Sequence, residues 1–232
     1  MMFVIGHRGA AGLAPENTIE AMRAGVKAGA DMIEFDIRLT HDNVPVIIHD
    51  ASLLRTHRQR GSIAALTINE LREKTQSNPV PTLAEVLDEF FGKIKLNIEC
   101  KSKGSGVIAL ELVKQHAKDA KDWENVLFSS FHISELRAIR EINNDAQLGL
   151  LHSKNPFSFV AHVNDLRLFG VGFYKYTVNP LALAIAKKRG LFTYAYTVNR
   201  TALARVLDRE GIDAIVTNRP DLIQKHLKNN GQ

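Results

Sequence analysis

Short runs of β-branched and aromatic residues alternate with amphipathic stretches along the whole chain. The runs cover residues 3–6, 32–39, 95–100, 126–129, 147–151, 168–174, 191–197 and 214–216. Between them lie segments with helical spacing, several of which end in Gly, as helix C-termini often do. Eight strand–helix units in one chain of this length predict an α/β fold, a (β/α)8 TIM barrel.

The connection between residues 39 and 95 is longer than one barrel helix requires. It holds an extra strand-like run, VPVIIH, then a basic loop and two helical patterns, TINELREK and TLAEVLDEF. We therefore predict a single domain over residues 1–232 with a small insertion after the second strand, at about residues 50–92. Long insertions are often lids or binding loops. Arg55, Arg58 and Arg60 would then attract an anionic substrate, unless they only form a solvated loop.

Composition narrows the class of protein. With 232 residues, 45% hydrophobic and 24% charged, the chain is typical of a globular protein and too apolar for a disordered one. Its single cysteine, Cys100, excludes an intramolecular disulfide and a Cys-rich zinc site and fits a reducing compartment. The amino terminus has no cationic, apolar leader pattern, and no segment is apolar enough to span a bilayer, so we expect a cytoplasmic protein without stable membrane insertion.

The net charge of +5 favours anionic partners in general. The basic clusters are spread over different predicted elements and are not interleaved with aromatic residues. We therefore expect a small-molecule substrate and no nucleic acid.

Polar residues end four of the apolar runs, where a barrel places its reactive groups. They are His7 and Arg8 after FVIG, Glu34 and Asp36 in MIEFDIRL, His49 and Asp50 after VPVII, and Glu99 and Lys101 in KLNIECKSK. Strand side chains alternate between faces, so residues two apart share one side, which in a barrel is the lumen.

Glu34, Asp36 and Glu99 would repel one another there if unpaired. A cation resolves this, and hard oxygen ligands without cysteine select Mg²⁺ or Ca²⁺ over zinc. The alternative is a layer of ion pairs, with Lys101 neutralising Glu99 and Arg38 neutralising Glu34. Three carboxylates, a divalent cation, Arg8 and Lys101 together carry one positive charge, which a phosphodiester anion would neutralise.

Two histidines beside such a site can divide general base and general acid work. His7 arrives from the first strand. A two-residue turn at Asp42-Asn43 would place His49 opposite Asp36 on a hairpin. His132 and His152 follow later strands and stay weaker candidates for pocket residues.

Two local motifs predict helix starts. In PENTIE, Asn17 is predicted to be the N-cap of the first helix, in a capping box with Glu20. As a further hypothesis, Glu16 or Asn17 supports His7. The loose G-x-G-x-x-A at Gly104 lies too far from its strand for a dinucleotide site, and Ser105 is expected to cap a helix there instead.

With these residues in place, the sequence resembles the glycerophosphodiester phosphodiesterase family in its short cytoplasmic bacterial form. The resemblance rests on HRGAAGLAPENT at 7–18, EFDIRLTHDNVPVIIHD at 34–50, IECK at 98–101, SSF at 129–131, YTVN at 196–199 and GIDAIVTNRPD at 211–221. It implies a TIM barrel and hydrolysis of glycerophosphodiesters to sn-glycerol 3-phosphate and an alcohol.

The resemblance also implies roles for single residues. His7 and His49 are similar to the catalytic pair, Glu34, Asp36 and Glu99 to the metal ligands, and Arg8 and Lys101 to the phosphate binders. Two positions depart from the family's usual pattern, because Tyr196 stands where Trp is usual and Asn218 where Asp is frequent. Tyr196 is expected to contact substrate, and Asn218 to support the last loop.

Two other functions remain open at this point. One is a related barrel phosphodiesterase that stops at a cyclic phosphate, as phospholipase C or D relatives do. The other is a non-catalytic protein that binds polyanions through its basic surface, which would need neither the paired carboxylates nor two histidines at strand ends.

Overall fold

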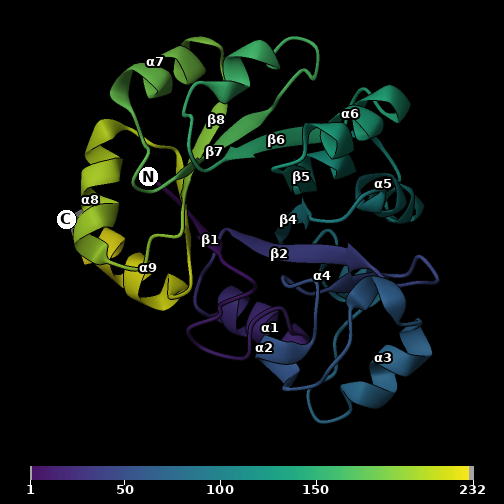
Figure 1. Ribbon diagram of the computed structural model, residues 1–232. Coiled ribbons are helices and arrows are strands. Elements are labelled where there is room, and N and C mark those ends of the chain that lie inside the picture. Colours follow the sequence, from purple (N-terminus) through teal and green to yellow (C-terminus); the bar gives the residue numbers. More distant parts are fainter. Residues whose placement is uncertain (1, 230–232) are drawn as a thin grey trace.

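The computed structural model describes residues 2–229, and eight parallel strands close into a barrel (Figure 1). The strands are β1 Phe3–Gly6, β2 Met32–Leu39, β4 Lys95–Cys100, β5 Val126–Ser130, β6 Gln147–His152, β7 Gly170–Tyr174, β8 Phe192–Tyr196 and β9 Ala214–Thr217. Each pairs with the next along the chain, and β9 pairs with β1 to close the ring. The predicted (β/α)8 barrel is confirmed, and the strand positions match the eight apolar runs.

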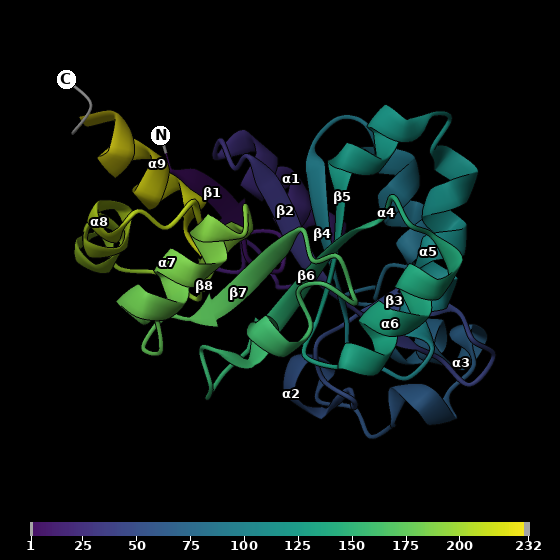
Figure 2. The same cartoon turned by 90° about the horizontal axis from the view of Figure 1, so that it is seen from above.

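Helices connect the strands and cover the barrel's outside; Figure 2 shows α4, α5 and α6 along the outside of β4 and β5. They are α1 Ile19–Lys27, α4 Leu83–Phe90, α5 Ser105–His116, α6 Ile133–Ile142, α7 Pro180–Lys188, α8 Thr201–Glu210 and α9 Pro220–Asn229, with 3-10 turns at Ala120–Asn125 and Ser158–Ala161. Within the described residues, the connection from β6 to β7 contains the 3-10 turn at Ser158–Ala161 in place of an α-helix.

Alternation along the strands produces two apolar layers. In β5, Leu127 points into the lumen, where it packs with Tyr194 and Val216, while Phe128 points outward into the core between barrel and helices. Because every second side chain of a strand points into the lumen, the polar side chains at the strand ends also alternate between the lumen and the outside. This is how the fold directs specific strand-end side chains into the mouth of the barrel.

The extra segment after β2 forms a small layer of its own. It contains β3 Pro45–Ile47, α2 Leu54–His57, a 3-10 turn at Ile63–Ala65 and α3 Ile68–Lys74. Val46, Leu53 and Leu71 build a separate apolar cluster there, whereas the buried face of α4 joins the main core. The part that is additional to a barrel unit therefore covers about residues 44–81, and the helix predicted from TLAEVLDEF is the barrel helix itself.

Two predicted caps are wrong. Helix α1 begins after Thr18, whose hydroxyl accepts the Ala21 N–H at 3.1 Å, while Asn17 takes a left-handed conformation with φ 58°. Helix α5 begins after Gly104 without a capping side chain on that residue.

The Ser105 hydroxyl instead donates to the Ser102 carbonyl. The free N–H groups of Gly104 and Gly106 donate to the buried Glu135 carboxylate from α6, which takes over the cap that Ser105 was expected to supply.

No helix among residues 2–229 is long and apolar enough to cross a membrane.

Candidate active site and metal centre

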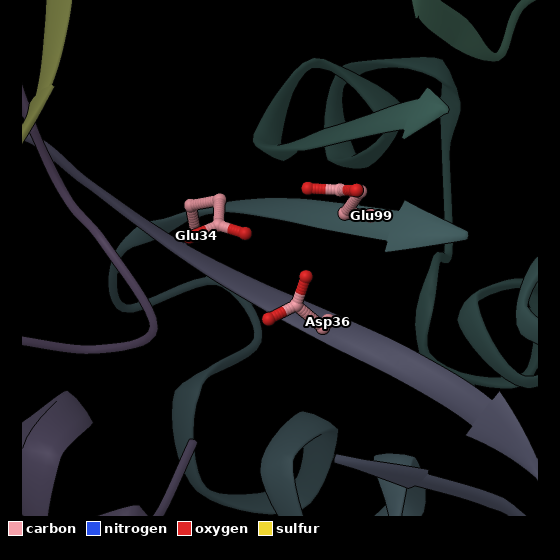
Figure 3. A group of neighbouring side chains, drawn as sticks. All are labelled: Glu34, Asp36 and Glu99. Carbon is pink, nitrogen blue, oxygen red and sulfur yellow. The ribbon is translucent and has the colours of Figure 1, made fainter. Parts of the chain in front are cut away.

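Three carboxylates from β2 and β4 meet at the carboxyl end of the barrel (Figure 3). Parallel pairing sets Asp36 level with Glu99, and Glu34 lies two residues before Asp36 on the same face. Each side chain offers an oxygen, and these oxygens lie within 4.8 Å of one another. The predicted convergence of the three side chains is confirmed; their binding of a metal stays a prediction.

Two cations flank the carboxylates. Lys101 Nζ lies 2.6 Å from Glu99 Oε1 and 3.2 Å from Asp36 Oδ1, and Arg8 Nε lies 3.4 Å from Asp36 Oδ2. Half of the alternative ion-pair layer is thus present. The other half is absent, because the Arg38 side chain donates to the His49 carbonyl at 2.7 Å and forms no ion pair with Glu34.

The environment pushes the acidities of the three carboxyls apart. Burial and the Asp36 charge raise the pKa of Glu99 to about 7, and the same two causes raise the pKa of Glu34 well above its ordinary value. Burial also acts on Asp36, but Lys101 and Arg8 outweigh it and hold the pKa of Asp36 below its usual range. The two cations are therefore insufficient for three buried carboxylates, and the cluster is short of positive charge.

One carboxylate oxygen is left without a partner. Glu34 Oε2 accepts the Arg8 backbone N–H at 2.8 Å, whereas Glu34 Oε1 is buried and has no hydrogen-bond partner. A buried, unpaired carboxylate oxygen is costly unless a ligand meets it. The donor set is all oxygen, so these residues fit a hard divalent cation.

His49 follows β3, but in a different register from the predicted hairpin. Thr40 pairs with Val44 around a three-residue loop, in which Asn43 has φ 60°, and the Ile48 N–H donates to the Asp36 carbonyl. The predicted two-residue turn is therefore wrong by one residue.

The His49 ring still belongs to this site. Its Nδ1 lies 2.6 Å from the Asp50 carboxylate, and Asp36 is among the charges that act on it.

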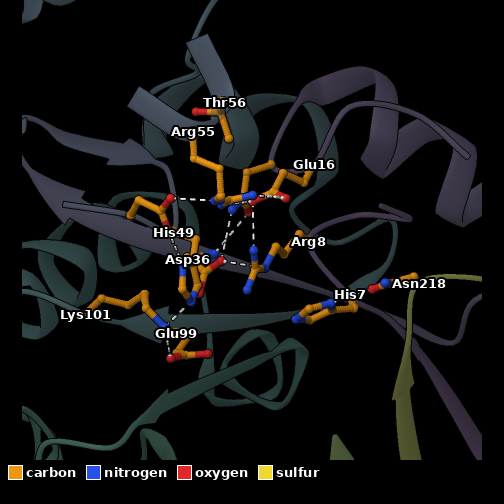
Figure 4. A network of polar contacts seen from close by, with 12 residues as sticks. His7, Arg8, Glu16, Asp36, His49, Arg55, Thr56, Glu99, Lys101 and Asn218 are labelled. Atoms are coloured by element: carbon orange, nitrogen blue, oxygen red, sulfur yellow. Dashed lines mark hydrogen bonds and ion pairs between the residues drawn. The ribbon is translucent and has the colours of Figure 1, made fainter. Parts of the chain in front are cut away.

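His7 is held by a residue from the end of the neighbouring strand β9. Its Nδ1 lies 2.6 Å from the Asn218 side-chain oxygen, after β9 (Figure 4). Asn218 therefore supports His7 directly, in addition to its place in the last loop. Glu16 binds Arg8 and Asn17 binds Asp36, so neither of the two expected supports hydrogen-bonds to the His7 ring, and Glu16 acts on it only through its charge.

The loop that carries His7 is tightly built against α1. Gly9 has φ 86°, and a Cβ there would lie 2.6 Å from the Ala21 backbone. Arg8 adopts φ 50°, a conformation that non-glycine residues rarely take outside special sites. Its backbone N–H thereby reaches Glu34, which ties the loop to the acidic cluster.

A small cavity of about 30 Å³ lies in the lumen next to the carboxylates. It is lined by His7, Glu34, Asn97, Glu99, Ser129, Leu151, Tyr194, Tyr196 and Val216. The Tyr196 hydroxyl donates to the His152 carbonyl at 2.7 Å, and its ring meets Phe131 edge to face. Tyr196 thus forms part of the wall, as expected of a substrate contact, which stays a prediction.

The two weaker histidine candidates lie apart from this cavity. His152 is buried against Phe173 on the outer side of the barrel, and burial lowers its pKa to about 4. His132 is exposed at the start of α6. Neither lines the cavity.

Sequence reasoning missed the contacts that four supporting residues make. They are Glu16 on Arg8, Asn17 on Asp36, Asp50 on His49 and Asn218 on His7. For Asp50 its place next to His49 was a usable signal. The other three contacts join residues 8 to 211 positions apart in the chain. That of Asn218 requires the closed barrel, and those of Glu16 and Asn17 require the folded loop before α1.

The chain is similar to proteins of one known family. Residues 7–222 match the glycerophosphoryl diester phosphodiesterase family. The chain is 35% identical to YhdW of Bacillus subtilis over 98% of both chains, and 30% identical to a glycerophosphodiester phosphodiesterase of the same organism over 98% of this chain and 87% of that protein.

Among solved structures, a phosphodiesterase of Oleispira antarctica in complex with the product sn-glycerol-3-phosphate superimposes with a TM-score of 0.85 at 28% identity. The match covers 97% of this chain and 96% of that one.

Proposed function

The chain belongs to the glycerophosphoryl diester phosphodiesterase family and is a phosphoric diester hydrolase, and on this premise we propose how it works. It hydrolyses glycerophosphodiesters to sn-glycerol 3-phosphate and an alcohol, using one divalent cation and two histidines. The observation that carries the proposal is the convergence of Glu34, Asp36 and Glu99, with one unpaired buried oxygen, between His7 and His49. The product bound to the Oleispira relative supports the same substrate class.

Glu34, Asp36 and Glu99 would hold Mg²⁺ or Ca²⁺ through their carboxylate oxygens. When bound, such a cation supplies Lewis-acid stabilisation of charge on phosphoryl oxygens. Arg8 and Lys101 add two fixed cations beside the cluster and bind the phosphodiester anion. With all of these groups in place the site is electrically neutral, as a water-poor site favours.

The hydrogen-bond partners of the two histidines support different roles for them. His7 donates its Nδ1 hydrogen to the neutral Asn218 amide oxygen, which leaves the Nε2 lone pair free to accept a proton. Burial, reinforced by the adjacent Arg8 charge, lowers the pKa of His7 to about 4, so its ring stays neutral near pH 7. His7 is therefore the general base, which deprotonates water or the glycerol 2-hydroxyl.

His49 is the general acid. Its Nδ1 faces the Asp50 carboxylate at 2.6 Å, and a carboxylate stabilises the protonated ring more than an amide does. In the free site, burial lowers the pKa of His49 despite Asp36 and Asp50. A bound phosphodiester anion adds a further negative charge, which favours the protonated form that the departing alkoxide needs.

Tyr196 completes one wall of the cavity, where it contacts the substrate. The buried Cys100 thiol fits action in a reducing cytoplasm.

An assay of sn-glycerol 3-phosphate release tests the function. Several glycerophosphodiesters are offered to the enzyme after chelation, and then with Mg²⁺ or Ca²⁺ added back. We expect release only with a metal. Full activity in chelator would refute the metal site, and steep salt-dependent DNA binding without any release would favour a polyanion-binding protein.

A further inference from the structure

Arg55 lies in the insertion, on the short helix α2, and its guanidinium group contacts two carboxylates at once. Nη2 and Nη1 lie 2.6 and 2.8 Å from the two oxygens of Glu16, and Nε lies 2.6 Å from Asp50 Oδ2. All three contacts have hydrogen-bond geometry. The charge of Arg55 is therefore already engaged, in contrast to the expectation that it attracts substrate from solution.

Both carboxylates continue into the active site. Glu16 Oε1 lies 2.7 Å from Arg8 Nη1, and Asp50 Oδ1 lies 2.6 Å from His49 Nδ1. Figure 4 shows the Arg55 side chain beside Glu16, with Arg8 on the far side of that carboxylate. The chain of contacts runs from Arg8 through Glu16, Arg55 and Asp50 to His49.

We propose that Arg55 is a positioning residue of this phosphodiesterase, a clamp that fixes His49 and Arg8 relative to each other. The inference rests on the proposed function for the roles of His49 and Arg8. It also gives the insertion a role in the active site, because Arg55 on α2 is the only residue among residues 2–229 that binds both Glu16 and Asp50. No contact of Arg55 with substrate is involved.

The chemistry of the guanidinium group suits this work. Its planar fork can bind one carboxylate through two N–H groups and still direct Nε at another. The hydrogen bond from Arg55 is the main cause that lowers the pKa of Asp50 to about 2. Asp50 is consequently ionised near pH 7 and can accept a hydrogen bond from the His49 ring.

Three variants separate positioning from surface charge. Arg55→Met removes the clamp, and Arg55→Lys keeps the charge but cannot reproduce the fork. Arg60→Met removes a charge from the same basic segment, at an exposed side chain with no ion pair to the described residues. All are measured at physiological salt, which screens surface charges strongly.

We expect Arg55→Met to lower kcat by about 10²-fold, since a small misplacement of an acid or base is worth that much. KM should change by less than about threefold, because Arg8 keeps its ion pair with Glu16. Arg55→Lys should lie between wild type and Arg55→Met, and Arg60→Met should match wild type. A loss confined to KM, or shared equally by Arg60→Met, would overturn the clamp in favour of surface attraction.

A second comparison uses His49→Ala as background. If Arg55 acts through His49, adding Arg55→Met there should cost less than about threefold in kcat. An undiminished 10²-fold loss would show that Arg55 works independently of His49, which contradicts the clamp. If Arg55→Met fails to fold by circular dichroism, Arg55→Lys carries the same two comparisons.

Histidine NMR makes the test independent of activity. Loss of the clamp should shift or broaden the His49 imidazole signals in Arg55→Met and leave them unchanged in Arg60→Met. If the wild type releases no sn-glycerol 3-phosphate, the proposed function fails, yet these spectra still decide whether Arg55 orders His49. Unchanged His49 signals in Arg55→Met would refute the clamp.

Discussion

Replacing Glu99 by Gln should stabilise the metal-free protein at alkaline pH. In the folded protein, burial and Asp36 raise the pKa of Glu99 from 4.5 to about 7 despite its ion pair with Lys101. Such a shift corresponds to about 3 kcal/mol, since a tenfold change in acidity is worth about 1.4 kcal/mol. Between pH 4.5 and about 7, the folded state thus holds a proton on Glu99 that the unfolded chain has already lost.

The sign of the effect follows from that proton. Between the unfolded pKa of 4.5 and the folded pKa of about 7, the folded wild type binds more protons, so its stability falls as the pH rises. Gln stays neutral and avoids this loss. Glu99→Gln should match wild type near pH 4.5 and exceed it by up to about 3 kcal/mol above pH 7.

Urea unfolding followed by circular dichroism, in chelator at several pH values, measures this difference. Glu73→Gln, on the exposed surface of α3, controls for removing one carboxylate from the chain. Added Mg²⁺ or Ca²⁺ should reverse the order, because only the wild type keeps all three ligands. If Glu99→Gln is no more stable than wild type in chelator above pH 7, Lys101 already neutralises Glu99 and the ion-pair alternative stands.

Three further outcomes follow from the site. Asp36→Asn should fold normally but lose most of its metal affinity, measured by calorimetry, and nearly all turnover. Unchanged metal affinity would show that Asp36 is not a ligand. His49→Ala should lower the rate about 10²- to 10⁴-fold on a glycerophosphodiester of an ordinary alcohol, but most of this rate should return on a nitrophenyl glycerophosphodiester, whose phenolate leaves unaided. His7→Ala should stay slow on both substrates. Equal losses of both variants on both substrates would refute the division of roles. Gly9→Ala should lower Tm and activity together, because the new Cβ meets the Ala21 backbone.

The barrel could be predicted from the sequence because each strand is a distinct apolar run and each alternates between two buried layers. Glu34, Asp36 and Glu99 were predictable for the same reason, since strand periodicity alone puts them on one face. The register of His49 was not, because one extra residue in the loop at Asn43 shifts every pairing behind it, and local sequence does not fix the loop length.

The supports of the site were also beyond sequence reasoning. Asn218 reaches His7 only after β9 has paired with β1. Arg55 reaches Glu16 only after the insertion has folded against the loop before α1. Asn17 looked like a helix cap because its residue type suits that position. In the fold, Asn17 takes a left-handed backbone conformation and its side chain binds Asp36, which helix propensity does not predict.

Phosphorus NMR of a glycerophosphodiester incubated with the enzyme tests the central claim most directly, because it identifies the product. In Mg²⁺ or Ca²⁺, the diester signal should give way to that of sn-glycerol 3-phosphate, and in chelator or with Asp36→Asn it should persist. A cyclic phosphate that accumulates as the end product, or conversion that continues in chelator, would contradict the account of a metal-assisted hydrolase at this cluster.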